Sequence, residues 1–407
     1  MRKGNKTILS PLLVREPGPQ NQLLFNTGLS VEQRQWKTSH QNPDCPLSKF
    51  VGNDKAKRRL SRAAYQMWGR ENHAGGDQQF SLIGGSSAGK TTLARLFGQT
   101  TLLPYVEIQP KAVQNALDIV EAFADVLDRV AYEQSGGDPI TLRLNPDENR
   151  VFVIPPTVAL IDEVHALPNP VVQALLKATE PKDGMLSLGD GWTADCRRVC
   201  WIIATTDRGL LFDAFDTRFR KIYLNLYGRD EIAEIVRRAN PDWDMSVCKL
   251  VAKYCWRVPR EALAFAVDMR AEYELQSHKG AVSWEQVAAS VARDNDIDSY
   301  GMTRQRITVL AALGQQGAIP RSRLILYAGC KEEELIHYLM PPLLTATENE
   351  PALVAVTSQG YSLTMAGIDE LNKRGIPNLG VDAVKIDIPA LDFGNYDPDD
   401  FEVSKAA

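Results

Sequence analysis

One run of residues constrains the fold of this chain more than any other feature: Gly84-Gly85-Ser86-Ser87-Ala88-Gly89-Lys90-Thr91. It matches the pattern G-x-x-x-x-G-K-[ST] without a mismatch. The apolar segment 80–83 precedes it, as a strand would, and 92–97 follows, as a helix would. The glycines let consecutive N–H groups point at phosphate oxygens, and the helix start adds partial positive charge. The sequence therefore predicts a phosphate-binding loop between a strand and a helix.

Two side chains in this loop have predicted roles of their own. Lys90 would reach the β- and γ-phosphates of a nucleotide, and Thr91 would hold Mg²⁺ through its hydroxyl. The alternative is a glycine-rich turn before an ordinary helix, and the flanking segments argue against it. The residues of this region that we expect to bind ATP are Gly84, Gly85, Ser86, Ser87, Ala88, Gly89, Lys90, Thr91 and Thr92.

A second motif places two acids at the end of an apolar strand. Residues 158–161 form a continuous apolar run typical of a buried parallel strand, and Asp162 and Glu163 follow it directly. This is the Walker B pattern, whose carboxylates end beside the phosphate loop at the crevice of the sheet. Asp162 would bind Mg²⁺, and Glu163 would polarise the attacking water. The alternative is a strand that ends in two solvated acids.

The order of apolar runs indicates an α/β fold. Strand-like runs at 80–83, 105–108, 158–161 and 199–204 alternate with helical patterns, which predicts a parallel sheet. Turn residues at 145–149 predict a hairpin insertion over 140–154, and a loop or second hairpin is expected at 184–195. No internal repeat is visible.

Patterning divides the chain into five parts. Residues 1–47 read as a mostly irregular extension, 48–228 as the α/β core, and 229–299 as a small all-helical unit. Residues 300–376 follow the order helix–helix–helix–hairpin of a winged helix. Residues 377–407 form an acidic tail with seven Asp/Glu and two Lys/Arg, which reads as a disordered tail or as a docking segment for a basic surface.

Composition narrows the class of protein. The six cysteines form no C-x-x-C pair, so a zinc site is not expected and the thiols suit a cytoplasmic compartment. No apolar run reaches the roughly 20 residues of a membrane helix, and no signal peptide is expected. The net charge of −5 does not indicate a nucleic-acid binder. A nucleic-acid surface would have to be a local patch or a ring formed by several copies.

Polar residues after the apolar run 199–204 supply further candidates. Thr206 lies where a strand tip could hydrogen-bond the water or the γ-phosphate. Arg218 and Arg220 lie together in one short segment, and Arg260 begins a helix in the all-helical unit. Arginine stabilises the charge that spreads over a transferring phosphoryl group, although each could also be an ordinary surface residue.

These motifs together resemble the AAA+ ATPases, and most of all the RuvB-type Holliday-junction branch-migration motors. The resemblance rests on the phosphate loop and on Phe50-Val51-Gly52-Asn53, Asp162-Glu163-Val164-His165, Ala204 through Leu211, Arg218-Phe219 and Val258-Pro259-Arg260. It covers about residues 48–375 in the same domain order. The fold it implies is an AAA+ P-loop parallel-sheet core, a small all-helical lid domain and a C-terminal winged-helix domain.

The resemblance implies a role for each matching residue. Phe50, Val51 and Gly52 would lie near the adenine. Thr206 would be sensor 1, Arg218 the arginine finger acting on the nucleotide of a neighbouring copy, with Arg220 as the fallback, and Arg260 sensor 2. A finger in trans implies a ring or helical homo-oligomer, with a hexamer expected, that hydrolyses ATP with Mg²⁺.

Some features depart from that family's pattern. The wing tip 357–361 lacks arginine, and the third helix of the winged-helix region begins with Glu332-Glu333-Glu334, which suits a phosphate backbone poorly. Arg304, Arg306, Arg321 and Arg323 could form a basic patch or an ordinary solvated surface. Residues 184–195 fall where RuvB-type motors have a hairpin that grips a partner protein, and core packing is the alternative. The hairpin insertion and both tails lie outside the pattern.

Three functions follow from these observations. The first is an ATP-driven DNA motor, a helicase or translocase of recombination, replication or repair. The second is an AAA+ switch that loads or regulates another DNA-bound protein, such as a helicase loader or a transposition ATPase. The third is a protein remodeller that uses the winged helix for protein contacts.

Overall fold

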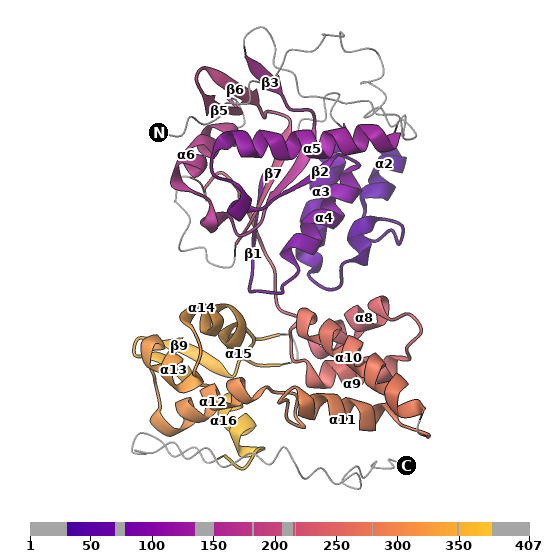
Figure 1. The fold of residues 1–407 in the computed structure, drawn as a ribbon, viewed down its shortest axis with the longest axis vertical. Coiled ribbons are helices and arrows are strands. Elements are labelled where there is room, and N and C mark those ends of the chain that lie inside the picture. The colour runs from indigo at the N-terminus through magenta and orange to yellow at the C-terminus, as the bar shows by residue number, and fades with distance from the viewer. Residues whose placement is uncertain are drawn as a thin grey trace, which may run out of the picture.

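The computed structural model of this chain describes residues 31–69, 78–134, 150–180, 183–205, 215, 217–278, 280–347 and 350–376. Figure 1 shows one body built around a central sheet and, below it, the helices that follow in sequence. The predicted extension up to residue 30, the acidic tail 377–407 and the first expected strand of the insertion, 140–144, lie outside the described residues. Within the part that is described, no helix is long and apolar enough to span a membrane.

The central sheet has five parallel strands in the order β2-β4-β7-β1-β8, which confirms the predicted parallel α/β fold. Its strands are β1 (Phe80–Ile83), β2 (Tyr105–Ile108), β4 (Thr157–Ile161), β7 (Val199–Thr205) and β8 (Arg220–Tyr223). Every residue of β4 and β7 is buried, because these strands lie inside the sheet and helices cover both faces. The carboxyl ends of β1 and β4 therefore share one edge of the sheet.

Helices cover the two faces of this sheet. The helices of the core are α3 (Asp54–Gly69), α4 (Lys90–Thr101), α5 (Ala116–Gln134) and α6 (Asn169–Ala178), with 3-10 turns η2 (Pro110–Ala112) and η3 (Val164–Ala166) between them. Along β7 the side chains alternate between two apolar clusters. Ile202 packs with α3 and α4, whereas Trp201 and Ile203 pack with α5 and α6. Because successive side chains of a strand point to opposite faces, the sheet packs against helices on both sides, which gives three layers: helix, sheet and helix.

A second, three-stranded sheet contains β3 (Val151–Val153), β5 (Met185–Gly189) and β6 (Trp192–Asp195). The pair β5–β6 is antiparallel, so the expected hairpin at 184–195 is confirmed. In the insertion predicted at 140–154, β3 pairs parallel with β6. Leu186 of this sheet is fully buried in the cluster that contains α5 and α6, so core packing accounts for that side chain.

Four helices follow the core, as the periodicity predicted: α8 (Arg229–Ala239), α9 (Met245–Tyr254), α10 (Pro259–Ser277) and α11 (Trp284–Asp294). We call them the α8–α11 group. They share an apolar cluster with α3 and α4 of the core, because buried residues such as Leu224, Tyr227 and Ile232 link the two parts.

The C-terminal group has its own apolar cluster. Its elements are α12 (Arg304–Gln316), α13 (Arg321–Ala328), α14 (Glu332–Glu334), η5 (Leu335–Leu339), α15 (Met340–Leu344), the antiparallel strands β9 (Val354–Thr357) and β10 (Gly360–Leu363), and α16 (Met365–Asn372). The helix expected over 332–344 is not uniform, because η5 is a π-helical turn. Pro341 and Pro342 follow this turn and have no N–H with which to continue an α-helical ladder.

Three buried arginine side chains join the C-terminal group to the α8–α11 group and to the linker that follows α11. Arg257 is fully buried and donates to the carbonyls of Pro342, Thr345 and Pro351 and to both the carbonyl and the carboxylate of Glu350. The other two contacts run from Arg306 to Glu261 and from Arg374 to Asp298. Buried guanidinium groups are costly unless paired, so these contacts hold the two groups in one arrangement.

The described part of the segment before the core contains a short helix and a turn, which the sequence pattern did not predict. Helix α2 (Val31–Thr38) packs on α3, and the 3-10 turn η1 (Pro46–Lys49) packs on α4. Leu47 is fully buried there. The sequence of α2 is too polar to show an apolar stripe, so local periodicity did not predict this helix.

Candidate nucleotide-binding site

A cavity of about 340 Å³ opens at the carboxyl edge of the central sheet. This volume lies within the usual range for small-molecule sites. Three segments far apart in sequence meet there: the phosphate loop, the end of β4 and the start of α10. The lining residues are Ser86, Ser87, Gly89, Lys90, Thr91, Thr92, Asp162, Glu163, Pro259, Arg260 and Leu263.

The backbone of the loop requires glycine at residue 89. Gly89 has a φ of 85° and directly precedes α4. A Cβ placed on it would lie 2.9 Å from the Phe50 ring and 2.8 Å from the Tyr227 hydroxyl. Side chains rarely adopt this φ, and no space exists for one here. The loop thus packs closely against two aromatic residues.

Lys90 is held inside the loop. Its ammonium group donates to the carbonyl oxygens of Gly84 and Gly85, with N···O distances of 3.0 and 3.1 Å. Burial lowers the pKa of this ammonium, and the nearby carboxylates of Glu163 and Asp162 oppose that shift. A desolvated cation at the start of a helix is suited to bind an anion.

Thr91 and Asp162 are in direct contact. The Thr91 hydroxyl donates to Asp162 Oδ2 at 2.5 Å, which joins the phosphate loop to the end of β4. Magnesium prefers oxygen ligands and commonly uses one or two carboxylates together with phosphates and water. The pair therefore fits a magnesium ion that phosphate oxygens also bind. Among the described residues, no cluster of three His, Cys, Asp or Glu offers a more complete metal site.

Glu163 turns away from the strand that carries Asp162. Its φ of 49° is left-handed, and its N–H donates to Asp162 Oδ1 at 3.0 Å. The His165 ring follows it: Nδ1 lies 3.4 Å from Glu163 Oε2 and 3.0 Å from Thr205 Oγ1 at the end of β7. The two acids of the motif therefore have separate surroundings, one beside Thr91 and one beside His165.

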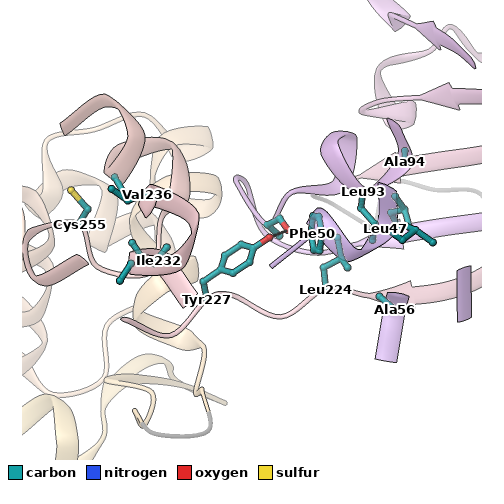
Figure 2. Close-up of a cluster of buried hydrophobic side chains, with 14 of the residues drawn as sticks. Leu47, Phe50, Ala56, Leu93, Ala94, Leu224, Tyr227, Ile232, Val236 and Cys255 are labelled. Carbon is teal, nitrogen blue, oxygen red and sulfur yellow. Dashed lines mark hydrogen bonds between the residues drawn. The ribbon is translucent and has the colours of Figure 1, made fainter. Parts of the chain in front are cut away.

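The segment that contains Phe50 lies against the linker between β8 and α8. Asn53 donates to the carbonyl of Asn225 and accepts from its N–H, at 3.2 and 2.8 Å. The Phe50 and Tyr227 rings lie with their centroids 6.4 Å apart, and Figure 2 shows Tyr227 extending toward Phe50 from the side of the α8–α11 group. Phe50 is buried and Val51 and Gly52 are partly exposed, and none of the three lines the cavity.

Tyr227 is not among the residues predicted from the sequence. This residue is buried, its hydroxyl donates to the carbonyl of Ala88 at 3.0 Å, and burial raises the pKa of the phenol. Its position just before the glycine that caps α8 was the available signal, because a large aromatic residue at a junction between two units often packs into both.

The other predicted residues differ in where they lie. Arg260 lines the cavity, whereas Gly84, Gly85 and Ala88 support the loop without lining it. Pro341 of the C-terminal group lies against Gly85, at 3.3 Å from the position of an added Cβ. Thr206 lies outside the described residues; its neighbour Thr205 is fully buried.

Arg218 lies at the opposite edge of the sheet. It precedes β8, which runs parallel to β1 with Arg220 beside Phe80, so it is at the amino ends of these strands. The phosphate loop follows their carboxyl ends. Arg218 Nη2 pairs with Glu180 Oε1 at 2.6 Å, and Arg220 Nη1 donates to Gln78 Oε1 at 3.2 Å. Arg218 is therefore separated from the cavity of its own chain by the length of the sheet.

The comparisons with known proteins agree with this arrangement. Residues 80–226 match the family model of the ATPase family associated with various cellular activities (AAA). The Holliday junction branch migration complex subunit RuvB of Synechococcus sp. (strain CC9902) is 24% identical over 332 residues, which are 79% of this chain and 86% of the relative.

Solved structures show the same fold over most of the chain. The RuvB Holliday junction branch migration motor of Thermotoga maritima aligns with a TM-score of 0.60 and 20% identity over 80% of this chain and 96% of that one. A single-residue variant of that motor gives the same values. At this identity the likeness concerns the fold. Residues 80–226 are thus similar to the AAA ATPase family, and the chain as a whole is similar to RuvB.

Proposed function

We propose that this chain is a Mg²⁺-dependent AAA+ ATPase that converts ATP and water into ADP and phosphate. One observation carries the proposal. The same cavity is lined by Lys90, Asp162, Glu163 and Arg260. The match of residues 80–226 to the AAA family model supports it independently.

Each side chain in the cavity has a chemical task in this proposal. Lys90 and the loop N–H groups bind the β- and γ-phosphates, and Thr91 with Asp162 holds Mg²⁺, which neutralises phosphate charge when bound. Glu163 accepts a proton from the attacking water or orients it. Thr206 senses the γ-phosphate as sensor 1. Phe50, Val51 and Gly52 would lie near the adenine, and Tyr227 packs on Phe50.

Arg260 supports a role for the α8–α11 group as the lid of an AAA+ core. It is the sensor 2 candidate, and it comes to the cavity at the first turn of α10. The buried Arg306 side chain pairs with Glu261, the residue that directly follows Arg260. A change in the position of Arg260 on hydrolysis would therefore move the C-terminal group together with the lid.

Arg218 supports assembly into an oligomer. It lies at the amino edge of the sheet, away from the cavity of its own chain, so a role in hydrolysis would have to be exerted on the nucleotide of a neighbour. We propose that it is an arginine finger in trans, with Arg220 as the alternative, in a ring or helical homo-oligomer, expected to be a hexamer. The six unpaired cysteines favour the reducing cytoplasm.

The similarity to RuvB favours action on DNA, and we propose a RuvB-like motor for branch migration or related DNA remodelling. The C-terminal group has the helix and hairpin order of a winged helix. Salt-dependent binding to duplex and junction DNA tests this part, because phosphate contacts release counterions. If the protein does not bind DNA even at low salt, the DNA motor is rejected, whereas the proposed ATPase activity is unaffected.

Two contacts favour a second candidate, in which the C-terminal group binds protein in an AAA+ switch or remodeller. Arg306 is one of the four arginines that could have formed a basic patch or a solvated surface, but its side chain is 2% exposed and paired with Glu261. Arg321 pairs with Glu332 at 3.4 Å. Leu326, Val356 and Met365 of the same group are exposed apolar residues, which are more typical of protein contacts.

The ATPase itself is tested with two variants of the cavity. Glu163→Gln should bind ATP and lose turnover by about 10²–10⁴-fold, the usual contribution of a general base. Lys90→Ala should lose ATP binding. Release of phosphate measures turnover, and a fluorescent ATP analogue measures binding. Turnover by Glu163→Gln equal to that of the unchanged protein would exclude the assigned role.

A further inference from the structure

We propose that His165 is a positioning residue for hydrolysis: it holds the Glu163 carboxylate in place by linking it to Thr205. This inference rests on the proposed ATPase function. It concerns a residue that has no assigned role in the proposed function, unlike the phosphate loop, the acids Asp162 and Glu163, and the arginines. The observations that carry it are the two contacts of one ring atom, His165 Nδ1, with Thr205 Oγ1 at 3.0 Å and with Glu163 Oε2 at 3.4 Å.

The register of the sheet brings these groups together. Strands β4 and β7 are parallel neighbours, with Ile161 beside Ile203. Glu163 comes two residues after Ile161, just beyond the end of β4, and Thr205 is the last residue of β7, two residues after Ile203. His165 follows Glu163 in the η3 turn, so its ring lies beside both chain ends. The contact therefore follows from the topology and does not depend on a distant loop.

The chemistry of the ring sets the direction of these hydrogen bonds. An ionised carboxylate only accepts, so the Glu163 contact is attractive when Nδ1 carries the proton. The same N–H can donate to the Thr205 hydroxyl oxygen, which leaves the hydroxyl hydrogen for another acceptor. A bare Nδ1 lone pair facing Glu163 would repel it. We therefore infer that His165 carries its proton on Nδ1, the ring atom that contacts both the Glu163 and the Thr205 oxygen.

Differences in exposure explain why Glu163 benefits from such a contact. The Glu163 side chain is 42% exposed, whereas that of His165 is 21% exposed and Thr205 is fully buried. A half-exposed glutamate has several rotamers, and only some of them face the cavity. A fixed neighbour anchored on a buried strand end reduces that freedom, and small errors in the position of a catalytic group are costly in rate.

Matched variants of His165 test this role. His165→Asn keeps a polar atom close to the position of Nδ1, whereas His165→Leu has a similar shape and no polar atom. His165→Gln places its amide nearer to the position of Nε2. Removal of a hydrogen-bond partner that orients a metal ligand typically costs about 10–100-fold in activity, and we take the same range for a partner that orients Glu163. We therefore expect kcat to fall about 10–100-fold in the Leu and Gln variants and to recover largely in the Asn variant.

Two further measurements separate positioning from a general structural role. The affinity for a fluorescent ATP analogue and the melting temperature should remain those of the unchanged protein in all three variants. Thr205→Val should lower kcat as His165→Leu does, and the double variant should be no worse than either single one, because both break the same link. Thr205→Ser is the control that retains the hydroxyl.

The outcomes distinguish this inference from the proposed function. If the unchanged protein turns over ATP and Glu163→Gln does not, while His165→Leu retains full kcat, the role of His165 is rejected and the ATPase stands. Equal losses of kcat in the Asn and Leu variants, or losses of ATP affinity, would also reject it. If the unchanged protein does not turn over ATP, the proposed function and this inference fail together.

Discussion

Arg306 of α12 and Glu261 of α10 form a two-point ion pair, with Nη1–Oε2 and Nη2–Oε1 distances of 3.0 and 2.7 Å. Glu261 directly follows Arg260, which lines the cavity. A residue of the C-terminal group thus holds the turn of α10 that faces the proposed nucleotide. The pair therefore connects the proposed site directly to the C-terminal group.

Removal of this arginine should loosen the connection. Loss of one partner of a fully buried pair costs about 3–5 kcal/mol, and we expect about 2 kcal/mol for Arg306→Met because Glu261 is 39% exposed. Urea unfolding measures the free energy of unfolding. The double variant Arg306→Met/Glu261→Leu should recover part of the loss, since it leaves no unpaired charge. A double variant less stable than the single one would contradict this account.

Substitution of Gly89 should affect the loop through crowding as well as backbone strain. Gly89 and Gly189 have nearly the same φ, 85° and 87°, but an added Cβ meets two aromatic side chains at Gly89 and nothing within 4 Å at Gly189. Gly189→Ala should therefore cost about 1–2 kcal/mol from strain alone and leave ATP binding unchanged. Gly89→Ala should cost more and weaken ATP binding. Calorimetric melting and ATP titration compare the two, and equal effects would show that crowding is unimportant.

Arg218→Ala should abolish turnover and retain ATP binding. An arginine finger contributes about 10³–10⁵-fold to turnover. A mixture of this variant with Lys90→Ala should regain activity that neither has alone, because some interfaces then combine an intact loop with an intact arginine. Arg220→Ala is the neighbouring control. If Arg220→Ala alone abolishes turnover, the finger is Arg220, and if mixing restores nothing, action in trans is wrong.

Alkaline pH should weaken ATP binding through Lys90. Burial lowers the pKa of its ammonium, and phosphate binds the charged form, so affinity is full below that pKa and declines as pH rises through it. The decline should approach tenfold per pH unit and begin below the ordinary lysine range. Competition with a fluorescent ATP analogue at constant Mg²⁺ measures it. Lys90→Met, with no group to titrate, should bind weakly with no such decline.

Local sequence patterns predicted the core well. The fully buried strand β4 was visible as an uninterrupted apolar run, and the glycine and lysine spacing located the loop that begins α4. These features depend on neighbours in sequence. The roles assigned to Thr206, Arg218 and Arg260 remain predictions.

Long-range contacts account for what the sequence did not reveal. The sequence did not reveal that Arg257 and Arg306 are buried, because their partners Glu350 and Glu261 lie 93 and 45 residues away. The separation of Arg218 from its own cavity depends on the strand order β7-β1-β8, which no local pattern encodes. Helix α2 is likewise set by its packing on α3 and not by its own polar sequence.

Tyr227 has a consequence for how the two halves of the protein can tilt. Its ring is wedged beside the aromatic neighbour at residue 50, and its hydroxyl is tethered to the loop carbonyl of Ala88. The helices that follow therefore begin next to a residue that is packed against the phosphate loop. A change in their tilt would alter the contacts of Tyr227 with Phe50 and Ala88, which couples the position of the helices to the shape of the loop.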